Sequence, residues 1–268
     1  MKRIGYSLAC LTGLAALAFT ATVASAAPAA NSAVINERIF NDCSGSTLVT
    51  NDSYPASISI SDDANDDCTG FANLHNWRFS ENDADPAIFA NADLFRFSAE
   101  LVIDGPGQCE AGLQISPWWS QNVEGRLNVR TTDGEIALFG GVLPFYNFSA
   151  NYGIFYQKGQ TIRIELNYTP NSNTEQDPAT LECKLTYGGN LYTSGVLPFS
   201  NFNPAEHPIY GSYGIMEQAQ AGGHIQCLWF PGVNQEVNAT WTNIEYHPDA
   251  KPTPTEPSTW GRIKTMYR

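Results

Sequence analysis

Acidic side chains crowd the segment SDDANDDCTG, which runs from residue 61 to residue 70 and holds Asp62, Asp63, Asp66 and Asp67. Carboxylate oxygens are ligands that Ca²⁺ prefers, so these four residues form a candidate calcium site. Their spacing is not that of an EF-hand. Counted from Asp62 or Asp63, the sixth residue is not Gly and the twelfth is not Glu. A solvated acidic loop is the alternative.

Two adjacent tryptophans, Trp118 and Trp119, follow Pro117 and the strand-like segment AGLQIS. Successive side chains of a strand point to opposite faces, so one ring is expected in the core and the other in solvent. An exposed indole offers a flat apolar face with a polar edge, which suits the face of a sugar ring. We therefore expect a glycan-binding surface here, with core packing as the alternative role.

Polar residues alternate with apolar ones along several segments, which predicts a sheet with one polar face. The candidate ligand-binding residues on that face, beside the two tryptophans, are Gln114, Arg130, Arg163, Lys184 and Gln226. If their strands are neighbours, the face is a charged groove that can hold a polysaccharide. An ordinary solvated sheet face is the alternative.

The candidate catalytic residues are Glu100, Glu165 and His224. A glycosidase needs two carboxylates across the scissile bond, which Glu100 supplies with Glu165 or Glu182 if their strands are adjacent. A lyase needs a base and a group that neutralises a uronate carboxylate. The residues considered for those roles are His75, His224, Arg130 and Gln226. No nucleophile elbow, phosphate-binding loop, zinc-protease motif or dinucleotide fingerprint is present.

The elements that must position these residues are short strands. The alternation is clearest in residues 94–104, 161–168, 181–187 and 237–246. Trp241 is expected to be buried in the last of them, and GRLNVRTTDGEIALF is expected to form a hairpin that turns at Asp133-Gly134. Two such sheets stacked on their apolar faces predict an all-β fold, a two-sheet antiparallel β-sandwich of the jelly-roll kind.

An internal repeat marks the second half of the chain. GVLPFYNF begins at Gly141, and GVLPFSNF, which differs at one position, begins at Gly195. Each copy follows a strand–turn–strand pattern, but Asp133 in the first turn is replaced by Tyr187 in the second. The apolar framework is kept and the polar atoms are not. We interpret the repeat as one structural corner built twice rather than a duplicated binding site.

The first 26 residues have the pattern of an export signal. Lys2 and Arg3 precede an apolar segment, and Ala24-Ser25-Ala26 is the small-x-small pattern that signal peptidase cuts. Cleavage after Ala26 predicts a secreted protein that is extracellular or bound to the cell surface.

Residues 27–250 are expected to form one β-sandwich domain, with a core at about 70–247 and a polar segment, 27–69, packed on it. Residues 251–268 read as a Pro/Thr-rich linker and a short basic tail. We predict that this tail is recognised by a sorting or attachment system, with a frayed terminus as the alternative.

Charge is distributed unevenly along the chain. Residues 27–250 carry eight Lys or Arg against 26 Asp or Glu, a net of −18, whereas residues 251–268 carry four against one, a net of +3. Nucleic-acid binding requires basic surface, so the acidic body argues against a nucleic-acid partner.

Five cysteines follow the predicted signal, so at least one is expected to be unpaired within the chain. We predict a disulfide between Cys43 and Cys68, and consider a second between Cys183 and Cys227. Metal binding through thiolates is not expected, because there is no C-x-x-C motif and the histidines are scattered.

The alternating strands, the segment YTSGVLPF and the closing strand VNATWTNIEY resemble the concanavalin A-like lectin and glucanase superfamily over residues 70–247. That resemblance implies a jelly-roll sandwich, often with a concave glycan-binding sheet. The E-x-D-x-E pattern of its glucanases is absent, and the Q-x-H strand motif of its alginate lyases occurs in reverse order, as His224-Ile225-Gln226. No family active site carries over.

These patterns predict an exported, non-catalytic protein that binds a polysaccharide or a cell-surface glycan. A polysaccharide-degrading hydrolase or lyase that uses a concave polar sheet is the alternative, and a structural envelope or surface protein is a third class. No cofactor is expected apart from calcium.

Overall fold

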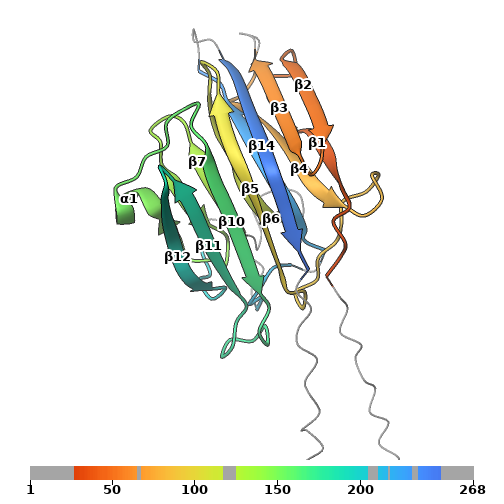
Figure 1. The fold of residues 1–268 in the computed structure, drawn as a ribbon, viewed down its shortest axis with the longest axis vertical. Helices are drawn as coiled ribbons and strands as arrows, with labels where there is room; N and C mark the ends of the chain where they lie inside the picture. The colour runs from red at the N-terminus through yellow and green to blue at the C-terminus, as the bar shows by residue number, and fades with distance from the viewer. Residues whose placement is uncertain are drawn as a thin grey trace, which may run out of the picture.

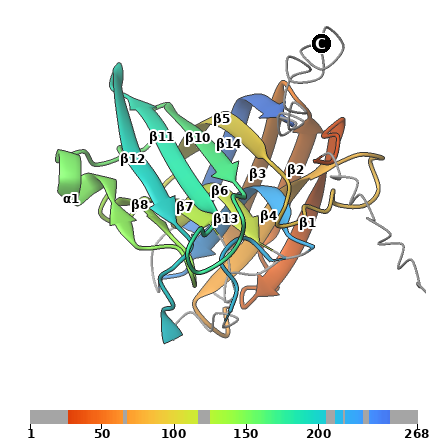
Figure 2. The ribbon, with the colours of Figure 1, turned by 90° about the horizontal axis from the view of Figure 1, so that it is seen from below.

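A computed structural model describes residues 27–64, 68–116, 125–204, 211–216, 218–230 and 235–248. These residues form two antiparallel sheets of seven strands each, stacked face to face (Figures 1 and 2). The prediction of a two-sheet antiparallel β-sandwich is therefore confirmed. Among the described residues, no helix is both long enough and apolar enough to cross a bilayer.

Sheet A contains, in spatial order, β1 (Ser32–Asn41), β4 (Ala72–Ser80), β13 (Gln220–Leu228), β6 (Gln108–Ser116), β7 (Gly125–Arg130), β8 (Ile136–Phe139) and β9 (Tyr146–Asn147). Sheet B contains β12 (Asn190–Pro198), β11 (Thr180–Tyr187), β10 (Ile162–Thr169), β5 (Phe95–Asp104), β14 (Gln235–His247), β3 (Ser57–Ala64) and β2 (Thr47–Ser53). The short helix α1 (Phe148–Tyr152) lies at one edge of the sandwich, in contact with β8 and β12 (Figure 2).

Strands from the two ends of the described chain pair with each other in both sheets. In sheet A β4 pairs with β13, and in sheet B β3 pairs with β14. The chain also passes from one sheet to the other between β3 and β4, β4 and β5, and β5 and β6. This wrapping is the predicted jelly-roll arrangement. Residues 27–69 supply β1, β2 and β3, so this segment belongs to both sheets.

The core lies between the sheets and is built by the predicted alternation. In β5, Ala99 and Leu101 are buried, and in β10 Ile164 and Ile162 are buried opposite them. Because each fully buried large apolar side chain contributes about 1.5–3 kcal/mol, these inward positions determine the strand register.

Two tryptophans join the sheets at the centre of the core. Trp77 from sheet A and Trp241 from sheet B meet edge to face, with ring centroids 6.1 Å apart. The Trp241 Nε1–H donates to the carbonyl oxygen of Gly112 in sheet A, at 3.2 Å. Gly223 in β13 lies beneath both rings, because a Cβ there would come within 2.2 Å of Trp77 Nε1 and 2.9 Å of Trp241 Cε2.

The internal repeat forms one hairpin in each sheet. β7 and β8 turn at Gly134 in sheet A, and β11 and β12 turn at Gly188 in sheet B, both glycines having positive φ. The repeated hairpin is therefore confirmed. The interpretation of the repeat as one corner built twice is wrong. In the first copy the chain leaves the strand after Phe139, whereas in the second β12 continues along β11 to Pro198. The two copies differ because β12 stays paired with β11 as far as Pro198, opposite Thr180, whereas the described pairing of β8 with β7 ends at Phe139, opposite Arg126.

The predicted disulfide between Cys43 and Cys68 is present. The second pairing that was considered, Cys183 with Cys227, is not formed, and both thiols are free and buried. These two residues lie in different sheets, on β11 and β13, and Cys227 is opposite Cys109 on β6.

We predict that Gly223→Ala destabilises the fold by about 1–3 kcal/mol, because the added methyl group overlaps both indole rings. Gly45→Ala is the matched control, since a Cβ there meets nothing within 4 Å, and it should change stability by no more than about 0.5 kcal/mol. Urea unfolding of the three proteins measures both effects. Equal stability of the two variants would contradict the packing argument.

Candidate functional site

The predicted binding residues divide between two opposite outer faces of the sandwich. Gln114, Arg130 and Gln226 lie on sheet A, next to inward-facing core residues of β6, β7 and β13. Arg163 and Lys184 lie on sheet B, on β10 and β11. The two sets therefore cannot line a single groove.

The charges on the outer face of sheet B are paired with one another. Arg163 contacts Glu245 at 2.9 Å, and Lys184 lies 3.7 Å from Glu165 and 3.4 Å from Glu182. A hollow of about 460 Å³ beside Arg163 and Glu245 is wide open to solvent. This arrangement matches an ordinary solvated sheet face.

The two candidate acids of sheet B lie on the adjacent strands β5 and β10. Glu100 is opposite Arg163 and accepts a hydrogen bond from Asn243 Nδ2 at 2.9 Å, while Glu165 is opposite Ser98. The two carboxylates are thus not directly opposed, and each has a partner of its own.

A buried polar layer covers the middle of the outer face of sheet A. Arg126 Nε and Nη2 donate to Gln114 Oε1 at 3.2 and 3.0 Å. On the neighbouring strands, His224 Nε2 donates to Asn128 Oδ1 at 2.7 Å. Asn128 in turn donates from Nδ2 to Glu110 Oε2 at 2.9 Å. The layer thus links β13, β6 and β7 through side chains.

His224 is held as a neutral imidazole. It is 1% exposed, and burial together with the positive charges of Arg126 and Arg78 lowers its pKa well below the usual value. Its Nε2–H is used by Asn128, and its Nδ1 has no hydrogen-bond partner in the described structure. Gln226, two residues further along the same strand face, is only half-buried.

An open groove adjoins this layer at the β7–β8 end of sheet A. One part, of about 150 Å³, is lined by Glu110, Asn128, Arg130, Glu135, Ala137, Phe139 and Phe145. A second part, of about 210 Å³, is lined by Phe139, Gly140, Leu143, Phe145, Asn201 and Asn203. Both parts share the two phenylalanines, so we treat them as one surface and call it the β7–β8 groove.

The two copies of the sequence repeat meet at this groove. The backbone N–H of Asn201, in the second copy, donates to the carbonyl of Val142, in the first, at 2.7 Å. Asn203 N–H donates to the carbonyl of Gly141 at 3.0 Å. One site is therefore built from both copies, which neither interpretation of the repeat had predicted.

Corresponding phenylalanines of the repeat have opposite surroundings. Phe145 is 61% exposed in the groove, whereas Phe199 is fully buried. Phe145 lies 6.4 Å from Phe139 between ring centroids, at an interplanar angle of 32°. The two rings form an apolar wall between the charged end of the groove and its amide end.

The charged end of the groove contains two glutamates around one arginine. Arg130 donates from Nε and Nη2 to Asp133 at 2.8 and 2.6 Å, and Nη2 also lies 3.1 Å from Glu135 Oε1. Asn147 Nδ2 donates to Glu135 Oε2 at 2.7 Å. Burial raises the pKa of Glu110, and the positive charges of Arg130 and Arg126 offset this only in part.

The predicted calcium ligands are separated by the fold. Asp62 and Asp63 are neighbours in β3, where Asp62 is fully buried and Asp63 lies on the other face of the strand. They cannot both bind one ion. Asp66 and Asp67 lie outside the described residues, as do Trp118, Trp119, the export signal and the basic tail.

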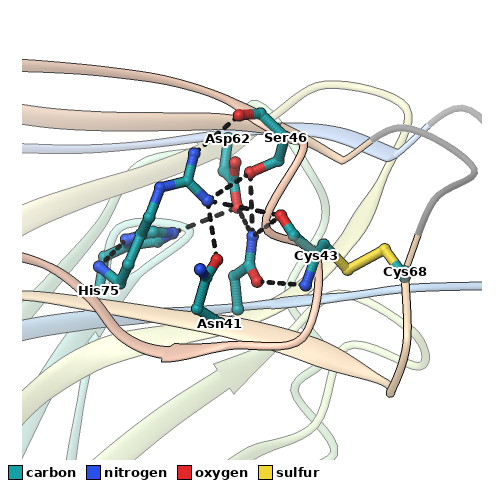
Figure 3. Close-up of polar contacts among 8 residues, drawn as sticks. Asn41, Cys43, Ser46, Asp62, Cys68 and His75 are labelled. Atoms are coloured by element: carbon teal, nitrogen blue, oxygen red, sulfur yellow. Dashed lines mark hydrogen bonds and ion pairs between the residues drawn. A yellow bond between two sulfur atoms is a disulfide. The ribbon is translucent and has the colours of Figure 1, made fainter.

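Asp62 instead anchors a buried polar cluster beside the disulfide (Figure 3). Its Oδ2 accepts from Asn73 Nδ2 at 2.7 Å and from His75 Nε2 at 3.2 Å. Burial alone would raise the pKa of this carboxyl. Hydrogen bonds with His75, Ser46 and Asn73 outweigh burial and hold the pKa below its usual value. The cluster thus ties the disulfide loop to β3 and β4.

The same cluster brings Asp62, His75 and Cys227 within 4.8 Å of one another through their potential metal-ligating atoms. A metal ion does not fit them. His75 Nδ1 accepts a hydrogen bond from the Arg38 backbone N–H at 2.9 Å, so the ring proton is on Nε2, the nitrogen that faces Asp62. Burial also holds the pKa of the Cys227 thiol well above its usual value. His75 is therefore a structural residue.

Comparison with solved structures finds similar chains. Arcelin-5, a lectin-like defence protein from Phaseolus vulgaris, is 9% identical with a TM-score of 0.43, over 84% of this chain and 96% of that one. A Lotus tetragonolobus seed lectin is 11% identical with a TM-score of 0.44, over 84% and 97%. The polysaccharide lyase family 7 alginate lyase AlgAT5 is 9% identical with a TM-score of 0.42, over 82% and 95%.

Lectins and alginate lyases are thus both among the similar structures. Identities and TM-scores this low assign no activity or ligand to the chain. No protein-family model and no curated protein sequence matches it.

Sequence reasoning named Arg130 but missed Glu110, Phe139 and Phe145 as groove residues. The repeat motif that contains Phe145 was the available signal. It was interpreted as structural framework because its apolar residues repeat and its polar ones do not, and of its two corresponding phenylalanines only Phe199 is buried as that interpretation requires.

We predict that Asp62→Asn lowers the free energy of unfolding at neutral pH by about 1–3 kcal/mol, because a buried acceptor network is broken. A carboxyl whose pKa is lowered by folding stabilises the native state above its unfolded pKa, and this stabilisation is lost as pH falls through the folded pKa. The difference between wild type and variant should therefore shrink below pH of about 4.

Urea unfolding between neutral and acidic pH measures this difference. Glu175→Gln removes an exposed carboxylate and is the matched control, expected to be neutral throughout. A gap between wild type and Asp62→Asn that stays constant down to strongly acidic pH would disprove the role of the ionised Asp62 carboxylate.

Proposed function

We propose that this protein is an exported glycan-binding protein and that the β7–β8 groove is its binding site. The observation that carries the proposal is Phe145, a large aromatic ring that is exposed in a groove whose lining also includes two carboxylates, an arginine and amides. The predicted export signal supports an extracellular or cell-surface location.

The groove has the two kinds of contact that a sugar chain needs. The Phe139–Phe145 wall is an apolar surface against which the C–H face of a pyranose can pack. Glu110 and Glu135 lie on one side of this wall and Asn201 on the other. Their oxygens and amide groups are hydrogen-bond partners for hydroxyls. Because Phe139 and Phe145 line both hollows, an extended chain that contacts both fits better than a single sugar.

The groove is held in place before a ligand arrives. Glu135, in the turn before β8, contacts both Arg130 of β7 and Asn147, the last residue of β9, and Asn128 donates to Glu110. A polar surface fixed in this way loses little conformational entropy on binding, which favours affinity.

The first test is a glycan-array screen of the mature protein, followed by titration calorimetry on each ligand found. Phe145→Ala should weaken binding about tenfold, because it removes the exposed apolar platform. Phe71→Ala is the matched control, since Phe71 is 57% exposed and precedes β4, three strands from β7 in the same sheet. Unchanged affinity in the Phe145 variant would refute the groove as the site. Absence of any glycan ligand would favour a structural surface protein.

Hydrolysis of the bound glycan is a second candidate function, favoured by the pair Glu110 and Glu135. A glycosidase uses a protonated acid beside an ionised one. Here burial raises the pKa of Glu110, while Glu135 is ion-paired with Arg130 in the same hollow.

Each glycan ligand should therefore be incubated with the protein and assayed for new reducing ends. If the protein is a hydrolase, Glu110→Gln should abolish product while keeping most of the binding, whereas Glu165→Gln on sheet B should not change the rate. Binding without any product would reject hydrolysis and support glycan binding as the function.

A further inference from the structure

We infer that the β7–β8 groove selects neutral, hydroxyl-rich glycans and discriminates against polyuronates and other anionic polysaccharides. This inference rests on the proposed function and names the chemical class of ligand for the same site. It is carried by the charges that surround the groove and by the partners that those charges already have.

Carboxylates outnumber cations at the charged end of the groove. Glu110 and Glu135 line it, and Asp133 accepts hydrogen bonds from Arg130. Arg130 is the cation among the lining residues of both hollows, within the described part of the chain. Three carboxylates therefore surround one guanidinium, a formal excess of two negative charges when all are ionised.

The guanidinium of Arg130 is also committed to these carboxylates. Its Nε and Nη2 bind Asp133 in the two-pronged geometry that suits a carboxylate, and Nη2 also reaches Glu135. A uronate carboxylate on a ligand would have to displace Asp133 or Glu135 to gain the same contact. Asp133 and Glu135 would both remain close to the incoming uronate carboxylate and repel it, so this exchange is unfavourable.

Arg126 and Arg78, two other arginines on this side of the sandwich, do not line the groove. Arg126 is almost fully buried and donates twice to Gln114, and Arg78 is fully buried. Neither is among the lining residues of the two hollows. The domain as a whole, residues 27–250, carries a net of −18, so its long-range field also repels polyanions.

Hydroxyl groups suit the same surface. Carboxyl oxygens accept hydrogen bonds and a sugar hydroxyl donates one, so Glu110 and Glu135 can each bind a hydroxyl. Asn201 at the other end offers both a donor and an acceptor. The Phe139–Phe145 wall lies between the two ends of the groove, and the face of a sugar ring that packs against it must be uncharged.

The decisive experiment compares matched oligosaccharides that differ only at C6. β-1,4-Linked mannose oligomers are paired with β-1,4-linked mannuronate oligomers of equal length, and cellooligosaccharides with their C6-oxidised forms. Calorimetric titration of the mature protein at low ionic strength should show at least tenfold tighter binding of the neutral member of whichever pair is recognised. Equal or tighter binding of the acidic member would overturn the inference, and no binding of any member would count against the proposed function itself.

Salt provides a second measurement on the unmodified protein. Electrostatic repulsion at a partly exposed surface is screened by salt, so the preference for the neutral member should narrow at about 0.5 M salt. A preference that does not change with salt would show that shape, rather than charge, excludes the acid.

The double variant Asp133→Asn/Glu135→Gln tests the residues responsible. It frees the Arg130 guanidinium and removes two negative charges, so affinity for the acidic oligomer should rise at least tenfold relative to the neutral one. Glu165→Gln/Glu182→Gln makes the same change in charge on the outer face of sheet B and is the control, expected to leave the ratio unaltered. A similar shift in both double variants would assign the preference to net charge instead of the groove.

Discussion

The contact between Trp77 and Trp241 over Gly223 is the constraint on which the rest of the structure depends. The two rings come from opposite sheets, and the indole N–H of Trp241 bonds to the backbone of sheet A. Because a side chain at Gly223 would overlap both rings, the separation of the sheets at their centre is set at this point. Packing at the density of a protein interior then determines which side chains of β4, β6, β13 and β14 face inward.

Since the inward positions are determined by packing, the outward positions on β6, β7 and β13 follow by alternation. This is why Glu110, Asn128 and Arg130 share one surface although they come from two strands. The register pairs Glu110 with Arg130 directly, and the hairpin to β8 adds Glu135. The charged end of the groove is therefore a consequence of how sheet A packs on sheet B.

The polar cluster around Asp62 shows the same fold used for a different purpose. An ionised carboxylate inside a sandwich is costly without hydrogen bonds, and Asn73 and His75 both donate to Oδ2 of Asp62. The result fastens β1 and the disulfide loop to β3 and β4 (Figure 3). It carries no chemistry, because the tautomer of His75 is determined by the Arg38 backbone. A perturbed carboxyl beside a histidine is thus not sufficient evidence of an active site.

The sequence by itself determined the class of fold, the inward faces of the strands around Phe97, Ile164 and Trp241, and the Cys43–Cys68 disulfide. These follow from local alternation and from the position of the two cysteines. Only the tertiary structure decided that Gln114 and Arg163 lie on opposite faces, and that Asp62 is buried while Asp63 is not. It also decided that Phe145 is exposed while its repeat partner Phe199 is buried. Which strands are neighbours depends on pairing between segments more than 100 residues apart, and alternation within a strand contains no information about that pairing.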